Sequence, residues 1–403
     1  MSKQDFRYCI SGVLPSTVFR FNMKIVHLCL SCFFIDNYSY QENLLPKYHV
    51  KMGHDVTVIA SLVSFNKEGR SCLLEGYQEY DDKNGFHVVR LPYRKPFALN
   101  KILRKYDGLS DVLQKEKPDI IFSHGIQFAD ISVVDRYLCA HPNVKLYADN
   151  HGDYVNSAKN FLSKNILHPI IWRHYAKRIE RQIVKCYGVT PMRCRFLKEM
   201  YHLNSSLVEF LPMGVDDEAI PKDRIKVKYD IRGELDIPKD ALVVFTGGKI
   251  DKRKNTHVLI DAINLIKNNK VHLILCGVLT PEMEYLMNDI HKNKNIHYLG
   301  WCNSERVMSC MVASDLACFP GTHSTLWEQF VGVGLPSIFK KWDEMEHVNV
   351  NDNCIFVSGN DSNEIADAIK KILSNYNVYL NRSQLAGNVF RYSQIAKKAI
   401  GYD

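Results

Sequence analysis

Short apolar runs rich in β-branched residues alternate with longer helical patterns along almost the whole chain. Two of the helical patterns are 255–266 and 364–373, and the second places Ile365, Ala368 and Ile369 on one face. Repeated strand–helix units of this kind predict mostly parallel sheets that are covered by helices on both faces. The runs predicted as strands are Lys24–Ser31, Asp55–Ser61, Phe86–Leu91, Asp119–Ser123, Lys145–Asp149, Cys186–Thr190, Leu207–Leu211, Ala241–Thr246, Val271–Cys276, Ile296–Leu299, Leu316–Phe319, Pro336–Phe339 and Cys354–Val357.

The length of 403 residues exceeds what one ordinary hydrophobic core supports, so the chain is expected to form two domains. The strand pattern begins only at Met23, and residues 1–22 are therefore expected to be a disordered extension, unless translation itself starts at Met23. A polar, charged stretch interrupts the pattern between the two halves. The predicted division is an N-terminal domain at 23–215, a linker at 216–240, a C-terminal domain at 241–385, and a helical segment at 386–403 that packs back on the N-terminal domain.

Two strand-to-helix turns in the second half combine glycines, cations and hydroxyl groups. The first, Thr246–Asn255, reads TGGKIDKRKN, and the second places Ser324 and Thr325 at the start of a helix that carries Glu328. Backbone N–H groups and the helix dipole at such turns favour anions, so the two turns together predict a nucleotide-sugar site. No G-x-G-x-x-G follows a strand and no G-x-x-x-x-G-K-[ST] occurs, which argues against a dinucleotide-dependent dehydrogenase and a P-loop ATPase.

The cationic turn has two interpretations, a ligand site or an ordinary solvated run of charge. Gly248 and the glycine before it let the backbone approach a ligand closely, so Lys249 and Lys254 are predicted to bind a diphosphate and to stabilise it as a leaving group. Lys252 and Arg253 are interpreted as solvated surface residues.

The order and spacing of these motifs resemble those of the retaining GT-B glycosyltransferases of family 4. Members carry a G-[RK]-x-x-x-x-K turn, which Gly248, Lys249 and Lys254 match, and then a helix glutamate and G-x-P, which are Glu328 and 334–336 in this chain. The resemblance covers most of the sequence, and the segments YQENLLPKYH and NHGDYVNS resemble capsular and cell-surface polysaccharide transferases. It implies an α/β, GT-B architecture of two facing doubly wound, Rossmann-like domains with a cleft between them.

The resemblance also implies roles for single residues of the donor site. Glu328 would bind the ribose hydroxyls, although Thr325 and Glu328 also fit an S/T-x-x-E capping box, in which the glutamate only satisfies a backbone N–H. Ser324 and Thr325 would offer hydroxyl groups and amides to the distal phosphate. Relatives often have a further glutamate where this chain has Pro320, and His323 is the expected substitute as a contact to the sugar.

In the first half, the resemblance points to residues on the other side of the cleft. His151 follows a predicted strand and would contact the donor sugar or a phosphate oxygen, with Asp153 orienting it. His124 ends the preceding strand, and Glu42 matches an acidic position of the first helix on the acceptor side. The loop 33–40 lacks the glycines that relatives often have there, which keeps a catalytically silent nucleotide- or glycan-binding relative as an alternative.

The sequence therefore predicts a glycosyltransferase that moves a sugar from a nucleoside-diphosphate sugar to a polysaccharide or lipid-linked acceptor, with retention. His151, Lys249 and Lys254 are the expected catalytic residues. No Asp-x-Asp motif occurs, so neither a metal nor another cofactor is expected, and the lysines would take the part of a divalent cation. A sugar-nucleotide epimerase or hydrolase on the same fold is the alternative enzyme.

Cysteine usage and charge indicate where such an enzyme would work. The chain has 12 cysteines, mostly in apolar runs, as in cytoplasmic proteins with reduced thiols. No apolar run approaches the roughly 20 residues that cross a bilayer. Basic and apolar residues are interleaved at 90–105 and 166–185, so a cytoplasmic protein that contacts an anionic membrane surface is expected, unless the second segment is a packed helix with a solvated basic face. No nucleic-acid partner is expected, because no recognised binding motif occurs.

Overall fold

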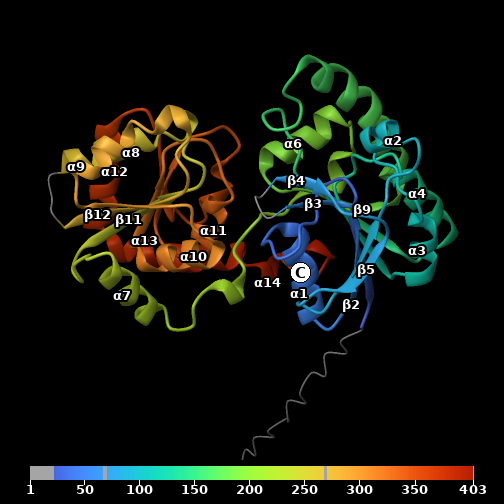
Figure 1. Cartoon of the computed structure of the whole chain (residues 1–403), viewed down its shortest axis with the longest axis horizontal. Coiled ribbons are helices and arrows are strands. Elements are labelled where there is room, and N and C mark those ends of the chain that lie inside the picture. Colours follow the sequence, from blue (N-terminus) through green and yellow to red (C-terminus); the bar gives the residue numbers. More distant parts are fainter. Residues whose placement is uncertain (1–21, 67–69, 267–269, 403) are drawn as a thin grey trace, which may run out of the picture.

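The computed structural model describes residues 22–66, 70–266 and 270–402, which form two α/β domains (Figure 1). Each domain has a mainly parallel sheet between layers of helices, which confirms the fold class that the alternating pattern predicts. The extension expected before Met23 lies, except for its last residue, outside the described part of the chain.

The first domain contains an eight-stranded sheet in the order β10-β9-β8-β7-β1-β2-β6-β5. Its neighbouring strands are parallel, except that β5 pairs antiparallel with β6; β3 and β4 form a separate antiparallel pair. Its strands are β1 (Lys24–Cys29), β2 (Asp55–Ser61), β3 (Val63–Phe65), β4 (Ser71–Leu73), β5 (Gln78–Asp81), β6 (His87–Leu91), β7 (Ile120–His124), β8 (Lys145–Asn150), β9 (Ile183–Gly188) and β10 (Val208–Phe210). Its helices are α1 (Gln41–Lys51), α2 (Phe97–Leu103), α3 (Leu109–Glu116), α4 (Ile131–Ala140), the π-helix η1 (Ser163–Trp172), α5 (Arg173–Ile179) and α6 (Pro191–Met200).

The second domain contains a fully parallel six-stranded sheet in the order β13-β12-β11-β14-β15-β16. Its strands are β11 (Leu242–Gly247), β12 (Val271–Cys276), β13 (Ile296–Gly300), β14 (Leu316–Phe319), β15 (Ser337–Lys340) and β16 (Cys354–Val357). The helices that follow the first domain are α7 (Arg224–Glu234), α8 (Thr256–Ile266), α9 (Leu286–Lys292), α10 (Ser304–Ala313), α11 (Leu326–Val333), α12 (Ser362–Ser374), α13 (Tyr376–Gly387) and α14 (Tyr392–Ala399), with short 3-10 turns η5 (Lys252–Lys254), η7 (Glu346–Val348) and η8 (Asn388–Phe390).

The central strands are buried on both faces because nearly all their side chains are apolar. In β7 (IIFSH) and β12 (VHLILC) every residue is buried. Continuous apolar strands are the usual pattern of parallel sheets that carry helices on both sides. Polar side chains gather where these strands end, and the carboxyl edges of parallel sheets are where ligands bind.

The chain crosses between the domains twice, and the two crossings lie side by side. Val215 donates its amide to the carbonyl of Phe390 at 2.8 Å, and Tyr392 donates its amide to the carbonyl of Val215 at 3.1 Å. Gly214 lies so close to this pairing that a Cβ there would be 2.1 Å from the Phe390 oxygen. After the second crossing, α14 packs against α1 in the first domain (Figure 1).

Residues 216–240, expected as a linker, contain α7. Ile231 and Arg232 on this helix are buried in the core of the second domain, and Arg232 Nη2 lies 2.7 Å from Asp315 Oδ2. The charged composition that suggested a linker therefore belongs to a helix that packs on α10 and uses its cation in a buried ion pair. Within the described residues, none of the helices has the length and apolar character needed to cross a bilayer.

Candidate functional site

The two domains meet around a small cavity of about 130 Å³ at the carboxyl edges of their sheets. Its walls come from the loop after β8, the start of α6, the loop after β14 and the loop after β15. Because α/β sheets bind ligands beyond the carboxyl ends of their strands, this cavity is the candidate site. The residues that line it are Asp153, Val155, Asn156, Met192 and Arg193 of the first domain, and Thr322, His323, Trp342 and Met345 of the second.

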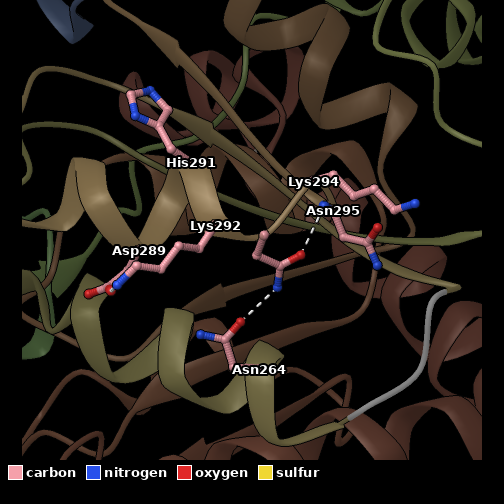
Figure 2. Close-up of a pocket in the computed structure, with 7 residues that line it drawn as sticks. Asn264, Asp289, His291, Lys292, Lys294 and Asn295 are labelled. Atoms are coloured by element: carbon pink, nitrogen blue, oxygen red, sulfur yellow. Dashed lines mark hydrogen bonds and ion pairs between the residues drawn. The ribbon is translucent and has the colours of Figure 1, made fainter.

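A wider hollow of about 570 Å³ lies at the opposite edge of the second sheet (Figure 2). Asn264 from the end of α8, His291 from α9 and Asn295 just before β13 line it. Asn293 donates to Asn264 across it at 2.7 Å. This hollow therefore lies at the amino end of its strand, away from the edge where ligands of such sheets bind.

The predicted cationic turn begins directly after β11. Gly248 has a φ of +108°, a backbone angle that favours glycine, and its amide donates to Cys276 at the end of β12. Asp251 caps the short helix η5 by accepting from the amide of Arg253, and it also pairs with the Arg253 guanidinium. The side chain of Lys249 is exposed.

Lys254 joins this turn to the second predicted loop. Its Nζ donates to the carbonyl oxygens of Thr322 at 2.8 Å and His323 at 3.2 Å. The amide of Thr322 in turn donates to the carbonyl of Arg253 at 3.0 Å, and Gly321 lies flat against the Lys254 backbone. Burial lowers the pKa of Lys254 to about 8. Two segments some seventy residues apart in sequence thus form one continuous wall.

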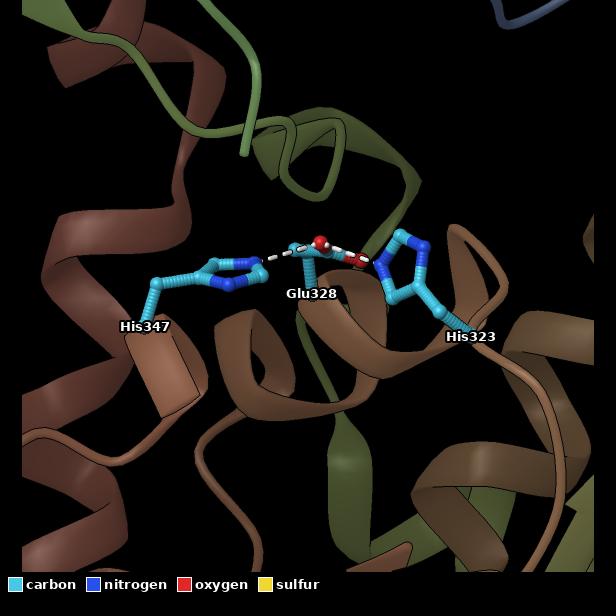
Figure 3. A group of neighbouring side chains, drawn as sticks. All are labelled: His323, Glu328 and His347. Carbon is cyan, nitrogen blue, oxygen red and sulfur yellow. Dashed lines mark hydrogen bonds and ion pairs between the residues drawn. The ribbon is translucent and has the colours of Figure 1, made fainter. Parts of the chain in front are cut away.

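Glu328 is fully buried in the first turn of α11, between two histidines (Figure 3). His323 Nε2 lies 2.7 Å and His347 Nε2 lies 2.8 Å from the same carboxylate oxygen, Oε1. Thr325 stands at the N-terminus of α11 with an exposed side chain that makes no capping hydrogen bond. The capping-box explanation of Glu328 is therefore wrong, because the carboxylate turns toward the histidines.

The two histidines determine the charge of this carboxylate. Burial alone would raise the pKa of Glu328, but the charge of His323 and the hydrogen bonds from His323 and His347 hold it well below its usual range. Two imidazoles and a carboxylate are also a ligand set for transition metals such as Zn²⁺, and their ligand atoms lie within 4.8 Å of one another. Among the described residues, this is the one group of three or more potential metal ligands whose ligand atoms lie this close together.

Three buried polar atoms beside this cluster lack a hydrogen-bond partner among the described residues. They are Glu328 Oε2, Ser324 Oγ and Trp327 Nε1. A buried polar atom without a partner destabilises a protein by about 1–3 kcal/mol, so three of them within one turn of chain indicate a place completed by a ligand. Glu328 Oε2 requires a donor, Trp327 Nε1 requires an acceptor, and Ser324 can serve as either.

On the first domain, Asp149 connects three segments at the end of β8. It is fully buried and accepts from Gln41 Nε2 at 2.8 Å and from the amide of Gly125 at 3.1 Å. His124 Nδ1 lies 3.1 Å from Asp149 Oδ2, the same oxygen that accepts from Gln41. Burial alone would raise the pKa of Asp149, but the charges of His124 and His151 hold it well below its usual range.

His151 lies in the loop after β8 with a third of its side chain exposed. Its Nε2 lies 3.5 Å from Asp149 Oδ2. Asp153, expected to orient this histidine, is instead held by Arg193 Nε at 3.2 Å and caps the amides of the turn that follows. Asp149 is thus the carboxylate within ion-pair distance of His151, although His151 Nε2 makes no hydrogen bond among the described residues, and the Asp153–Arg193 pair lines the cavity.

Two other predicted residues of the first domain lie beneath the cleft. Glu42 in the first turn of α1 is 8% exposed, and His124 is 1% exposed with both ring nitrogens hydrogen-bonded. Neither side chain is therefore exposed at the surface where an acceptor would lie, and both are buried beneath it.

The sequence analysis missed Asp149, Gln41 and His347. Asp149 ends a predicted strand two residues before His151, so the rule that ligands gather at carboxyl strand ends could have found it. His347 carries no such signal, because it lies in an irregular turn 19 residues after Glu328.

Two family models match this chain, one for each domain. Residues 45–219 match the model described as Glycosyltransferase Family 4, and residues 227–388 match the model described as Glycosyl transferases group 1. The lipopolysaccharide core biosynthesis glycosyltransferase LpsE of Rhizobium meliloti is 25% identical over 179 residues, which are 42% of this chain and 50% of that protein. The chain thus spans about half the length of this curated relative.

Solved structures share the fold over nearly the whole chain. A glycosyltransferase from Rickettsia africae matches with a TM-score of 0.65 at 16% identity, covering 94% of this chain and 96% of its own. HepE of Anabaena, in complex with UDP and glucose, matches with a TM-score of 0.61 at 16% identity, covering 94% and 98%. The architecture is therefore GT-B, as the resemblance implied.

Proposed function

We propose, from the premise that both domains of this GT-B chain match glycosyltransferase family models, that it transfers a sugar from a nucleoside-diphosphate sugar to a glycan or lipid-linked acceptor. The observation that carries the proposal is the wall that Lys254 forms with the loop 322–323, beside Glu328 and facing Asp153 and Arg193 across the interdomain cavity. The HepE structure in complex with UDP and glucose supports a nucleotide sugar as the donor.

In this proposal the second domain holds the nucleotide. Glu328 accepts the ribose hydroxyls through Oε2, the oxygen that lacks a partner, while the histidines hold Oε1. Lys249 and Lys254 neutralise the diphosphate, with Ser324 and Thr325 at the distal phosphate. Such cations stabilise the charge that develops on the leaving diphosphate as the glycosidic bond breaks.

The first domain contributes the sugar-facing side. His151 hydrogen-bonds the donor sugar or a phosphate oxygen, and Asp149 fixes the direction of its ring. We infer retention of configuration through an oxocarbenium-like transition state, in which the leaving phosphate takes the proton of the acceptor hydroxyl. The lysines supply the positive charge, so the proposed hexosyl transfer needs no metal.

The ribose contact gives a direct test of the proposal. We expect one of UDP, GDP, dTDP, ADP or CMP at about 100 times its dissociation constant to stabilise the protein by about 2.7 kcal/mol in thermal unfolding. Glu328→Gln should weaken that nucleotide about 10- to 100-fold, because it removes a charged acceptor. A 2′,3′-dideoxy analogue of that nucleotide should bind the native protein about as weakly as the unmodified nucleotide binds Glu328→Gln. Its affinity should fall little further in the variant.

Three outcomes would contradict the proposed transfer, and a fourth would contradict the ribose role of Glu328. Absence of a thermal shift for every nucleotide would leave no donor site, and binding without turnover of any sugar nucleotide would favour a catalytically silent module. Turnover of the sugar nucleotide without an acceptor would favour an epimerase or hydrolase. Stoichiometric Zn²⁺ binding that Glu328→Gln abolishes, with no effect of that variant on nucleotides, would assign the cluster to a metal instead.

We also propose that the first domain rests on an anionic membrane. The end of α2 lies against the end of η1, with the Arg104 guanidinium over the Trp172 ring at 5.5 Å. Arg90 of the expected basic run is buried and bonded to Asp36, so it does not contribute to the surface. The apolar–basic surface consists of the exposed side chains of Phe97, Leu99, Lys101, Ile102, Phe161, Leu162, Lys164 and Ile170.

This surface predicts binding to vesicles that contain anionic lipid. Binding should weaken as salt rises, because the lysines are attracted by the surface potential. Phe161→Ser with Leu162→Ser should reduce it at least 10-fold, since both side chains are more than 60% exposed and would enter the bilayer interface. Ile225→Ser, at a 71% exposed apolar residue of α7, is the matched control and should change nothing. Vesicle sedimentation measures the binding, and equal loss in both variants would contradict this surface.

A further inference from the structure

Three buried histidines form an unbroken hydrogen-bonded line under the first sheet. His124 Nε2 lies 3.0 Å from His27 Nδ1, and His27 Nε2 lies 2.9 Å from His49 Nδ1. The line ends at His49 Nε2, which lies 2.9 Å from the carbonyl oxygen of Ala396 in α14, and at His124 Nδ1, which lies 3.1 Å from Asp149 Oδ2. All three rings are at most 1% exposed.

The two ends of this line fix the number of protons in it. The Ala396 carbonyl only accepts, so His49 donates from Nε2 and its Nδ1 must accept from His27 unless the ring is charged. Because His27 donates from Nε2 to His49, its own Nδ1 must likewise accept a hydrogen bond from His124 Nε2. Asp149 as a carboxylate also only accepts. Four hydrogen bonds, each with one proton, therefore require four protons on three rings, one more than three neutral imidazoles carry.

We propose that His27, His49 and His124 form a buried relay that holds one extra proton between Asp149 at the cleft and α14, and that through Asp149 this relay positions His151. The extra proton sits at the Asp149 end, where the carboxylate is the nearest negative charge. The positive charge of His124 and the negative charge of Asp149 cancel, so the cluster is neutral as a whole. This inference follows from the hydrogen-bond geometry and does not depend on the proposed sugar transfer.

The surroundings of the relay agree with this placement. Burial and the neighbouring rings lower the pKa of His27, and burial lowers the pKa of His49 to about 3, so neither ring holds the extra proton. Burial acts in the same direction on His124, but Cys29 and Asp149 raise the pKa of that ring to about 9. The other titratable groups that face the line are Glu42 of α1, Cys32 after β1, His54 beside His49, and His151 beside Asp149.

The relay has a consequence for the cleft. Asp149 already has a counter-charge in His124, so His151 is free to use its exposed edge for a ligand. When the extra proton is absent, His151 is the remaining histidine within ion-pair distance of this carboxylate in the described structure. Loss of the extra proton therefore leaves His151 as the imidazole that can turn an N–H toward Asp149, which changes how its ring faces the cleft. The far end of the line is the Ala396 carbonyl of α14, so the relay also depends on the packing of this helix against the first domain.

Nitrogen-15 spectra of the histidine rings in the full chain test the relay directly. Near neutral pH we expect His124 to carry protons on both nitrogens, and His27 and His49 to carry one each, on Nε2. His27→Gln keeps an acceptor toward His124 and a donor toward His49, so His124 should stay doubly protonated. His27→Leu removes the acceptor, and His124 should then carry a single proton, on Nδ1, while the ring signals of His151 should shift as that ring turns toward Asp149.

The pH dependence supplies a second readout. The pKa of His124 is raised from 6.5 to about 9. The stabilisation that this extra proton gives to the folded protein is therefore fully present below pH 6.5 and is lost as pH rises through about 9. In the spectra, the second proton of His124 should leave as pH rises through about 9. A neutral His124 in the native protein near pH 7, or an imidazolium that survives in His27→Leu, would overturn the relay. Loss of the second proton in His27→Gln as well would overturn it too, since that variant keeps the polarity of the line.

Discussion

Alanine in place of Lys254 is expected to reduce sugar transfer by about 100- to 1,000-fold, the usual effect of removing one preorganised cation or donor at a leaving group. Lys254 connects the cationic turn to the loop after β14, because it lies on that turn and its Nζ donates to the carbonyls of residues 322 and 323. The reduction should appear in kcat as well as in nucleotide affinity, since the diphosphate gains charge as it leaves.

Lys252→Ala is the matched control for this loss. Lys252 lies two residues away in the same turn, and its side chain is exposed. It should leave transfer and nucleotide affinity within about twofold, as ordinary surface substitutions do. If Lys254→Ala retains full activity at an unchanged thermal midpoint, the cation at this position has only a structural part in holding the loop, and the proposed catalytic role is wrong.

The charge of Lys254 also gives the site a pH limit. Its pKa is lowered by burial to about 8, so the ammonium is present below that value and is lost as pH rises through it. Nucleotide affinity of the native protein should therefore fall above pH 8. Lys254→Arg should bind with no such fall, because a guanidinium stays protonated over this range. Isothermal titration across the range distinguishes the two, and parallel curves would assign the fall to another group.

Gly277→Ala is expected to lower the free energy of unfolding by about 3 kcal/mol or more, because nothing in the turn can yield to a new methyl group. A Cβ at Gly277 would lie 1.8 Å from the carbonyl oxygen of Gly248. This contact lets the cationic turn lie flat on the end of β12, where the Gly248 amide donates to Cys276 at 2.9 Å. The variant should therefore also lose nucleotide binding at temperatures where it remains folded.

Gly300→Ala separates the clash from the backbone effect. Gly300 has a φ of +64°, but no atom lies within 4 Å of its Cβ position. That variant should lose only about 1–2 kcal/mol, the strain of an L-residue in a left-handed conformation. Urea unfolding measures both variants, and an equal loss would mean that strain alone, not the close contact with Gly248, explains the glycine at 277.

The sequence predicted the parallel strands and the two strand-to-helix turns of the second half, because both depend on local patterns, but it missed the short strands β3, β4 and β5. Apolar runs of four or more residues favour buried parallel strands wherever they lie in the chain. The glycines and cations of 246–255 mark a turn that can approach an anion, and the structure brings this turn to the loop of His323, as the motif spacing requires.

The sequence failed where side chains from distant segments choose among possible partners. Asp153 and Asp149 are both near His151 in sequence, and only the fold gives Asp153 to Arg193 and Asp149 to the histidine. The same limit applies to Thr325 and Glu328, whose spacing fits a cap that the histidines replace. The linker prediction failed for another reason: α7 is charged on its outer face, and its buried face uses Arg232, which a hydropathy pattern does not recognise as core.

The paired crossings at Val215 and Phe390 bear on how the two domains move. The two crossings hydrogen-bond to each other, so any rotation of one domain against the other must bend both of them together. Sliding or twisting would break the bonds between the crossings, and Gly214 and Gly332 leave no space there for the chain to slip. The paired segments at residues 215 and 390 therefore act as the hinge for the cavity that His323 and Arg193 line. Substitutions that stiffen this hinge should slow the exchange of a ligand in the cavity.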